Sequence, residues 1–217
     1  SSDHVLNGMS DKTYSNACAQ LEALGVQLRL GVRLSSYDGM VAKLNDGSDI
    51  RTSALLWTAG VKGAVIAGIP EQGLERGNRI RVDAFNRVAG ADGLYAIGDV
   101  AAMTEGGSAP HPMLGPVAMQ QGKLLAKNLN RAKGQAWQPF VYKDRGTMAT
   151  IGRSKAVAEL AGGIRLKGFP AWMAWLFIHL VLLVGFRNRV VVFFNWMWNY
   201  FSYDRAIRLI IRPFKGR

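Results

Sequence analysis

The sequence predicts an α/β fold that ends in an apolar, aromatic and basic segment. Short apolar runs alternate with helical patterns along the first 160 residues, which is typical of α/β proteins. One of these runs, Leu94–Ile97, ends in Gly98-Asp99, and a long apolar stretch begins at Phe169. With 217 residues, 49% of them hydrophobic, the chain can form one large domain or two small ones.

The first 60 residues predict one helix followed by short strands. Ser10-Asp11 is an N-cap pattern, and Gly25 is the expected end of the helix. Turn signals at Asp38-Gly39 and Asp46-Gly47 predict hairpins. The strands expected from alternating or apolar patterns are 26–30, 40–44 and 54–57.

The next hundred residues predict further strands and one helix. Residues 106–112 combine glycine and proline, so we expect a loop there. Val117, Gln121 and Leu124 recur at helical spacing, which predicts a helix over 117–130. The strands expected in this part are 80–82 and 94–97, and residues 146–157 predict either two strands or a strand and a turn.

Gly98-Asp99 carries the chemistry of this region. Glycine allows the backbone to approach a ligand closely, and an aspartate accepts hydrogen bonds from sugar-type hydroxyls. This pair after a strand is typical of the part of a flavoprotein that holds the ribityl and phosphate groups of FAD. No G-x-G-x-x-G occurs in the 217 residues, so the chain carries the second half of a flavin site without the first.

Three motifs in a fixed order make the interpretation specific. They are Trp57–Val61 with its turn Thr58-Ala59-Gly60, then Tyr95–Asp99, and then Ala118–Gly122 at a helix start. Together with the C-terminal sequence from Gly185 to Phe214, they resemble a bacterial branch of the type II NADH dehydrogenases, the non-pumping NADH:quinone oxidoreductases. The resemblance covers the chain as the C-terminal half of such an enzyme, a partial two-dinucleotide-binding, Rossmann-like flavoprotein.

The resemblance implies roles for particular residues. Gly98 and Asp99 would bind FAD, Ala118 and Met119 would lie against its ring, and Thr58, Ala59 and Gly60 would form the turn on the nicotinamide side. NADH would be the substrate and a membrane quinone the electron acceptor. No residue of the chain is expected to be catalytic as an acid or base, because hydride transfer depends mainly on positioning.

The sequence departs from the family at the helix start. The family usually has Ala-Gln where this chain has Gly115-Pro116, and a proline side chain cannot hydrogen-bond a quinone. Pro116 and Gln120 remain the quinone-side candidates, and we expect Gln121 to be exposed on the helix surface.

The implied organisation has three parts: the end of the NADH-binding domain (1–62), the returning part of the FAD-binding domain (63–160) and a membrane-anchoring helical tail (161–217). The N-terminal half of the enzyme would be a missing partner, and a homodimer is compatible with the sequence. The expected location is the cytoplasmic face of a bacterial inner membrane.

The tail is expected to lie on the membrane. Residues 169–186 carry no formal charge, and the length of this stretch is at the lower limit for a helix that spans a membrane. Asn195, Asn199, Ser202, Arg205, Arg208 and Arg212 form a polar stripe beside many aromatic residues. Residues 187–217 hold seven basic residues and one acid, half of the net charge of +12. This pattern favours an amphipathic anchor on an anionic lipid bilayer rather than nucleic-acid binding, and a buried helix pair is the alternative.

Other functions are disfavoured by single residues. Cys18 stands alone, which excludes an internal disulfide, a cysteine-ligated metal site and the paired cysteines of a sulfide:quinone reductase. His111 and His179 are expected to be structural. Besides the NADH:quinone oxidoreductase, two alternatives stay open: a flavin-dependent quinone reductase with another donor, and a membrane-surface module without redox activity.

Overall fold

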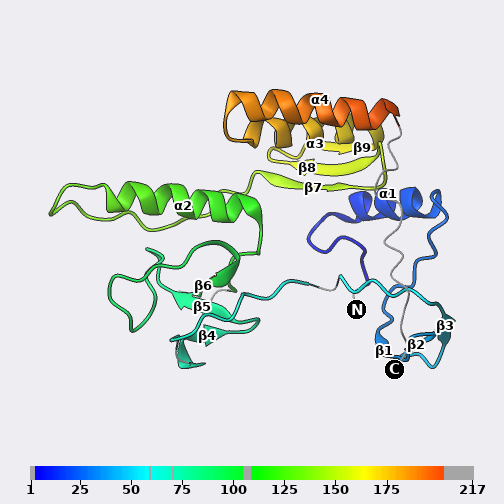
Figure 1. Cartoon of the computed structure of the whole chain (residues 1–217), viewed down its shortest axis with the longest axis horizontal. Coiled ribbons are helices and arrows are strands. Elements are labelled where there is room, and N and C mark those ends of the chain that lie inside the picture. Colours follow the sequence, from blue (N-terminus) through cyan, green and yellow to red (C-terminus); the bar gives the residue numbers. More distant parts are fainter. Residues whose placement is uncertain (1–2, 59, 70, 105–108, 203–217) are drawn as a thin grey trace. The chain divides into compact units, whose positions relative to one another are not determined.

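The computed structural model describes residues 3–58, 60–69, 71–104 and 109–202, and these residues fall into two compact units (Figure 1). The split unit combines residues 1–52 with residues 145–217, and the central unit comprises residues 53–144. Each unit has its own small antiparallel or mixed sheets and its own buried cluster.

A three-stranded antiparallel sheet forms the middle of the split unit. Its strands are β7 (Gly146–Thr150), β8 (Ala156–Leu160) and β9 (Arg165–Lys167), and helices α1 (Asp11–Glu22) and α3 (Gly168–Leu182) pack on it. Side chains alternate along β8: Val157 packs with Ala17 of α1, whereas Ala156 and Ala158 pack with Ala171 of α3. The sheet is therefore covered by a helix on each face, as Figure 1 shows.

The remaining sheet of the split unit confirms the predicted hairpins. Strands β1 (Leu34–Tyr37), β2 (Val41–Leu44) and β3 (Asp49–Arg51) pair antiparallel in chain order. Aspartate side chains stabilise both turns: Asp38 Oδ1 accepts the Val41 N–H at 2.7 Å, and Asp46 Oδ1 accepts the Ser48 N–H at 2.9 Å.

Helix α1 and the pair β7–β8 also agree with the sequence predictions. Helix α1 begins after Ser10 and ends before Gly25, and residues 146–157 contain β7 and the start of β8. Strand β9 was not predicted.

Three predicted strands are wrong. Residues 26–30 and 54–57 are extended but belong to no sheet, and residues 94–97 form only an isolated bridge between Tyr95 and Arg87. A strand needs a hydrogen-bonded neighbouring strand, and residues 26–30 and 54–57 pair with none in the part of the chain that the structure describes. Residues 94–97 bond only the loop residues 86–88. In the segment 54–57 the large apolar side chains are exposed, Trp57 to 68% and Leu56 to 89%.

The central unit places helix α2 (Gly115–Leu129) over a sheet of order β4-β5-β6 (Figure 1). The sheet consists of β4 (Leu74–Glu75), β5 (Arg79–Val82) and β6 (Ala101–Met103), and β5 and β6 are parallel. Two 3-10 turns, η1 (Glu71–Gly73) and η2 (Gly98–Val100), complete the unit. Ile80, Val82, Met103 and Val117 form its core, so the helix predicted over 117–130 and the strand at 80–82 are confirmed, while the described residues 109–112 of the predicted loop are non-helical.

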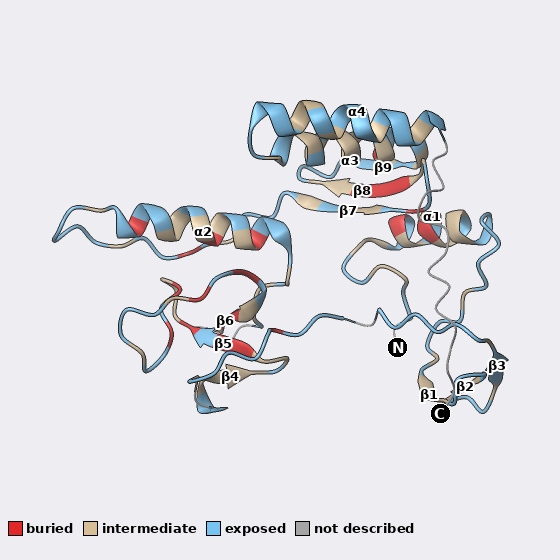
Figure 2. Cartoon of the chain, viewed as in Figure 1, coloured by how far each residue is buried: buried red, intermediate tan, exposed pale blue. Residues whose placement is uncertain are grey.

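Helix α4 (Phe186–Ser202) packs along α3 and leaves much of its apolar surface open to solvent (Figure 2). Trp196 and Tyr200 of α4 contact Trp175 and Trp172 of α3, with ring centroids 6.1 and 5.3 Å apart. Within the described ranges, neither helix has the length and apolarity needed to cross a bilayer. The predicted polar stripe continues at Arg205, Arg208 and Arg212, which lie outside the described residues.

Candidate functional site

The candidate site is built on the turn η2, where the chain leaves the extended segment 94–97 and enters β6. Gly98 has a φ of +70°, a conformation that L side chains rarely adopt. A Cβ added at Gly98 would also lie 3.0 Å from the Cβ of Ala118 in the first turn of α2. Glycine is thus required both by the backbone conformation and by the close approach of the turn to the helix.

Gln121 holds this turn against α2. Its side chain is only 1% exposed, and its Oε1 accepts a hydrogen bond from the Gly98 N–H at 2.7 Å. The prediction that Gln121 is exposed is wrong, because the buried Gly98 amide needs an acceptor and α2 supplies one. The sequence did contain the signal: Gln121 lies one helical turn after Val117, which is buried at 2% exposure.

Asp99 follows in the same turn and is exposed to solvent. Its carboxylate accepts no hydrogen bond from any residue that the structure describes, so its oxygens remain open to a ligand. A buried cation lies behind it. Arg79, 8% exposed, donates from Nε to the Ala101 carbonyl at 3.0 Å and from Nη2 to the His111 carbonyl at 2.9 Å.

Arg79 and Asp99 interact through their charges. Burial lowers the pKa of the Arg79 guanidinium, and the negative charge of Asp99 raises it in part. Sequence reasoning missed Arg79, although its place beside the apolar residues of a short strand could have suggested that one arginine faces inward. The site therefore combines a buried positive charge with an exposed carboxylate.

The N-terminus of α2 adds a second positive element to the site. Leu114 is the N-cap residue and makes no side-chain cap, Pro116 lies in the first turn, and the first turn contains no acid. The positive end of the helix dipole is therefore not neutralised there. Met119 is 54% exposed beside it, while Ala118 packs close to η2.

Together, η2 and the start of α2 fit the ribityl and phosphate part of a flavin dinucleotide. The glycine provides a surface without a side chain, the free carboxylate accepts from hydroxyls, and the helix end attracts negative charge. The structure brings Gly98, Asp99, Ala118 and Met119 into one place, as the sequence predicts.

The other predicted residues of the central unit lie in the segment around Thr58 and in the first turns of α2. Thr58 and Gly60 are exposed in an extended segment, with the Gly60 N–H bonded to the Thr58 carbonyl at 3.0 Å, and Ala59 lies outside the described residues. The Gln120 amide bonds the backbone of Lys143 twice, donating at 3.0 Å and accepting at 3.1 Å. Pro116 is exposed at the start of α2.

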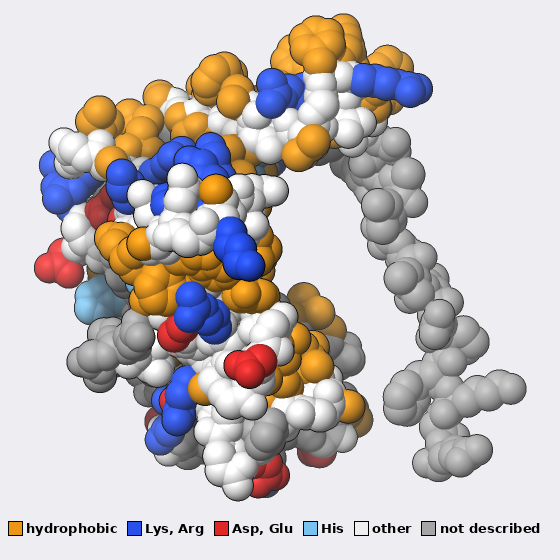
Figure 3. Space-filling model, turned by 90° about the vertical axis from the view of Figure 1, so that its left-hand side faces the viewer, with side chains coloured by type: hydrophobic (Ala, Val, Ile, Leu, Met, Phe, Trp, Pro, Cys, Tyr) orange, Lys and Arg blue, Asp and Glu red, His pale blue; other side chains and the backbone are white. Residues whose placement is uncertain are grey.

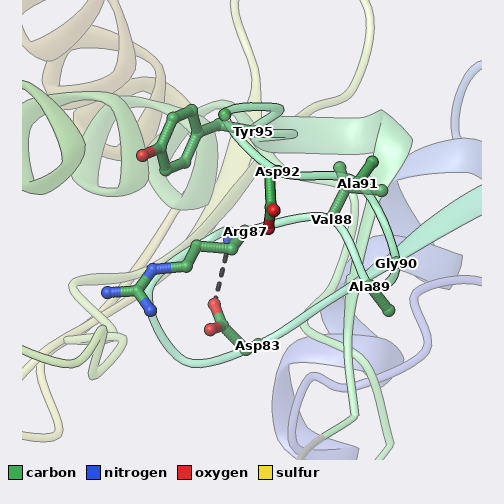
Figure 4. Close-up of a pocket in the computed structure, with 9 residues that line it drawn as sticks. Asp83, Arg87, Val88, Ala89, Gly90, Ala91, Asp92 and Tyr95 are labelled. Atoms are coloured by element: carbon green, nitrogen blue, oxygen red, sulfur yellow. Dashed lines mark hydrogen bonds between the residues drawn. The ribbon is translucent and has the colours of Figure 1, made fainter.

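A pocket of about 240 Å³ lies at the loop between β5 and Tyr95 (Figure 4). Two of its charged residues, Asp83 and Arg87, already have structural roles. Asp83 Oδ1 accepts the Arg87 N–H at 2.9 Å, and the Arg87 guanidinium lies 4.9 Å from the ring centres of Phe85 and Trp137. We therefore assign Asp83 and Arg87 a structural role, in which they stabilise the loop between β5 and Tyr95.

Comparison with known protein families defines the class of protein. The chain belongs to the pyridine nucleotide-disulphide oxidoreductase family, whose sequence model matches residues 1–122. Within that class, it resembles the type II NADH:quinone oxidoreductases. The model of the NDH2 C-terminal domain matches residues 145–203.

Two relatives illustrate the match. The type II NADH:quinone oxidoreductase Ndh of Mycobacterium tuberculosis is 32% identical over 93% of this chain and 45% of its own length. The mitochondrial internal alternative NAD(P)H-ubiquinone oxidoreductase A1 of Arabidopsis thaliana is 32% identical over 95% of this chain and 44% of its own length. The chain thus spans less than half the length of these curated relatives.

A solved structure supports the same fold. The structure of NDH2 from Plasmodium falciparum in complex with NADH matches with a TM-score of 0.80 and 15% sequence identity, covering 92% of this chain and 57% of that one. At this identity the likeness concerns the fold alone.

Proposed function

We propose that this chain forms the FAD-holding and membrane-attaching part of a type II NADH:quinone oxidoreductase. The single observation that carries the proposal is the Gly98-Asp99 turn, fixed to α2 by Gln121 and presenting an unpaired carboxylate among the described residues. When bound, FAD would supply the chemistry that connects hydride donation by NADH with reduction of a quinone.

Each residue of the site has a defined task in this proposal. Asp99 accepts hydrogen bonds from ribityl hydroxyls, and Arg79 supports the negative charge of the site from below. Ala118 and Met119 lie against the flavin ring. Thr58, Ala59 and Gly60 form the nicotinamide-side turn. These side chains bind and orient, and none is needed as an acid or base.

The quinone side of the flavin is proposed to lie at the start of α2. Because both polar ends of the Gln120 amide bond Lys143, this side chain would have to break two hydrogen bonds to reach a quinone. Pro116 and the exposed Met119 instead offer apolar surface. We therefore propose that a quinone is held here mainly by apolar packing against Pro116 and Met119, and less by a hydrogen bond from a side chain.

The remaining parts of the enzyme follow from the family. The chain spans less than half of its relatives' length and contains no G-x-G-x-x-G, and we propose that the N-terminal half of the enzyme supplies that loop. The proposed division into the end of an NADH domain (1–62), part of a FAD domain (63–160) and a tail (161–217) rests on the same resemblance. A homodimer is compatible with it.

The helices α3 and α4 are the proposed membrane anchor. Phe169, Met173, Phe177 and Val181 recur every fourth residue on α3 and are each at least 46% exposed. On α4, Phe194, Trp198 and Phe201 are exposed as well. Figure 3 shows hydrophobic side chains gathered along the upper edge of the view, where α3 and α4 lie, with Lys and Arg among them.

Such a surface suits helices that lie in the lipid interface. We propose attachment to anionic lipid at the cytoplasmic face of a bacterial inner membrane. The exposed apolar surface also favours the second candidate function, a membrane-surface module without redox activity.

Flavin binding separates the two functions. In Asp99→Asn, the loss of a charged acceptor should weaken FAD binding at least tenfold, since a hydrogen bond to a charged group is worth about 1.5–3 kcal/mol. Flavin absorbance per purified chain and FAD titration would measure it. Asp92→Asn, an exposed acid in the same unit, is the matched control. Equal FAD affinity of Asp99→Asn and the wild type would refute the assigned role of Asp99.

A further inference from the structure

A second pocket in the split unit has a cationic lining that the proposed function does not use. It has a volume of about 250 Å³ and lies between α1 and β9. Lys12, Thr13 and Asn16 contribute from the first turns of α1, and Arg165 and Lys167 contribute from β9. None of the described residues that line it is acidic.

The three cations converge on the pocket from two elements that are far apart in the sequence. Lys167 reaches across to α1, where its Nζ donates to Asn16 Oδ1 at 3.4 Å, and the Asn16 amide is itself held by the Lys12 carbonyl at 2.8 Å. This contact fixes one wall against the other. Like charges gathered in this way repel one another, and a bound anion would relieve the repulsion.

The nearest acid does not neutralise the pocket. The Glu159 carboxylate accepts from the Ser10 N–H at 3.1 Å and from the hydroxyls of Ser10 and Thr13, and it lies 3.6 Å from Arg165 Nε. The Glu159 carboxylate is therefore occupied by hydrogen bonds at the start of α1. Of the three cations, only Arg165 forms an ion pair with it. Lys12 and Lys167 keep ammonium N–H groups for a ligand.

We propose that this pocket binds a phosphate group. Two ammonium groups and a guanidinium around a cavity of this size match the charge and the several acceptor oxygens of a phosphate. The pocket also lies next to the start of the apolar helix α3, because β9 ends at Lys167 and α3 begins at Gly168. The phosphate can therefore belong to a lipid headgroup or to a soluble compound, and the chemistry of recognition is the same.

The variant Lys12→Gln/Lys167→Gln tests the proposal. It removes two exposed charges and leaves Arg165, the partner of Glu159, in place. Lys43→Gln/Arg51→Gln, exposed residues of β2 and β3 in the same unit, is the control with the same loss of net charge. FAD content should be unchanged in both variants, which separates this test from that of the proposed function.

Two measurements distinguish the phosphate sources. In the first, the unfolding temperature is compared in inorganic phosphate and in chloride at equal ionic strength. In the second, co-sedimentation is measured with phosphatidylcholine vesicles that contain or lack phosphatidylglycerol. We expect phosphate to stabilise the wild type and the control but not the pocket variant. Partition onto phosphatidylglycerol vesicles should fall about tenfold in the pocket variant and less in the control.

Each outcome decides the proposal. Pocket-dependent binding in both measurements supports a phosphate site that takes a lipid headgroup. A pocket-dependent response to inorganic phosphate alone supports a site for a soluble phosphate compound. If the pocket variant and the control behave alike in both measurements, the three cations are merely solvated and the proposal is wrong.

Discussion

Gln121 shows how one buried polar side chain can position a site that it does not itself reach. It satisfies the Gly98 amide inside the protein, so the backbone of η2 is held in a single orientation beside α2. Asp99 depends on that orientation, since it is the next residue. The residue that would meet the ligand is exposed, and the residue that orients it is buried.

Replacing Gln121 should therefore cost stability. In Gln121→Leu the buried Gly98 N–H loses its acceptor, and we expect the free energy of unfolding to fall by about 2 kcal/mol. Gln120→Leu is the matched control, because Gln120 is only partly buried and water can replace its bonds to Lys143. Urea denaturation would measure both variants, and an equal loss in the two would contradict the account.

Gly98→Ala tests the close approach of the turn to the helix. The substitution strains a backbone at φ +70° and places a methyl group 3.0 Å from Ala118 Cβ. Gly90→Ala has the same strain, at φ +76°, but meets no atom within 4 Å. We expect Gly98→Ala to lose about 1–3 kcal/mol more than Gly90→Ala in thermal unfolding. FAD affinity should fall only in Gly98→Ala, and an unchanged affinity would argue against this turn as the flavin site.

A candidate site residue could be singled out from the sequence where it belongs to a recognisable motif. Residues that only position another part of the site, such as Gln121 and Arg79, could not. The pair Gly98-Asp99 alone fits a plain turn as well as a flavin site, and it was singled out because it stands in a fixed order with Trp57–Val61 and Ala118–Gly122. Gln121 was misjudged because polarity outweighed its helical spacing with Val117. Arg79 has no local signature, since its partners are the carbonyls of Ala101 and His111, far along the chain.

At the scale of elements, Glu159 of β8 joins the sheet to the start of α1. Hydrogen bonds from Ser10 and Thr13 lower the pKa of this carboxyl below its usual range. A group whose pKa is lower in the folded state stabilises the fold above its unfolded pKa, and this contribution is lost as the pH falls through the folded value.

Glu159→Gln should remove this contribution. We expect it to lower the free energy of unfolding by about 1 kcal/mol at pH 7, and the difference from the wild type should shrink as the pH falls below 4. Glu75→Gln, which breaks a partly exposed ion pair with Arg81, is the control and should cost less, because Glu75 does not cap the start of a helix as Glu159 does. Denaturation at several pH values checks this, and a pH-independent difference would contradict the assigned ionisation.

Elements were predictable where the sequence around them contains their stabilising partners. Helices α1 and α2, strand β2 and the turns on either side of it are local and were predicted, whereas β1 was expected at residues 26–30. Residues 26–30 and 54–57 have strand-like sequences but lie beside no strand in the described chain, and an alternating pattern cannot reveal that. Strand β9 was missed because its three residues, Arg165 to Lys167, are too few and too polar to form a pattern.

At the scale of the whole molecule, the chain combines a candidate flavin site in one unit with an apolar helix pair in the other. The pairing of residues 1–52 with residues 145–217 in one unit could not be predicted, because it rests on contacts such as that of Ala17 with Val157. Neither residue has a sequence pattern that points to the other.

Membrane attachment should depend on the exposed aromatic residues of α3 and α4. Phe177 and Trp198 are 67% and 69% exposed, and each large side chain buried in lipid is worth about 1.5–3 kcal/mol. Phe177→Ser/Trp198→Ser should therefore bind uncharged phosphatidylcholine vesicles at least tenfold more weakly. Met40→Ser/Leu56→Ser, at 74% and 89% exposure outside these helices, is the control. Equal binding of both variants would place the lipid contact elsewhere.

The central claim is that this chain holds the flavin of an NADH:quinone oxidoreductase. Its most direct test is NADH-dependent reduction of a quinone by the purified natural protein, measured together with its flavin absorbance. The account predicts stoichiometric FAD and quinone reduction, with both lost in Asp99→Asn and both retained in Asp92→Asn. Quinone reduction that persists in Asp99→Asn without bound flavin, or a wild type that neither binds added FAD nor reduces quinone, would contradict it.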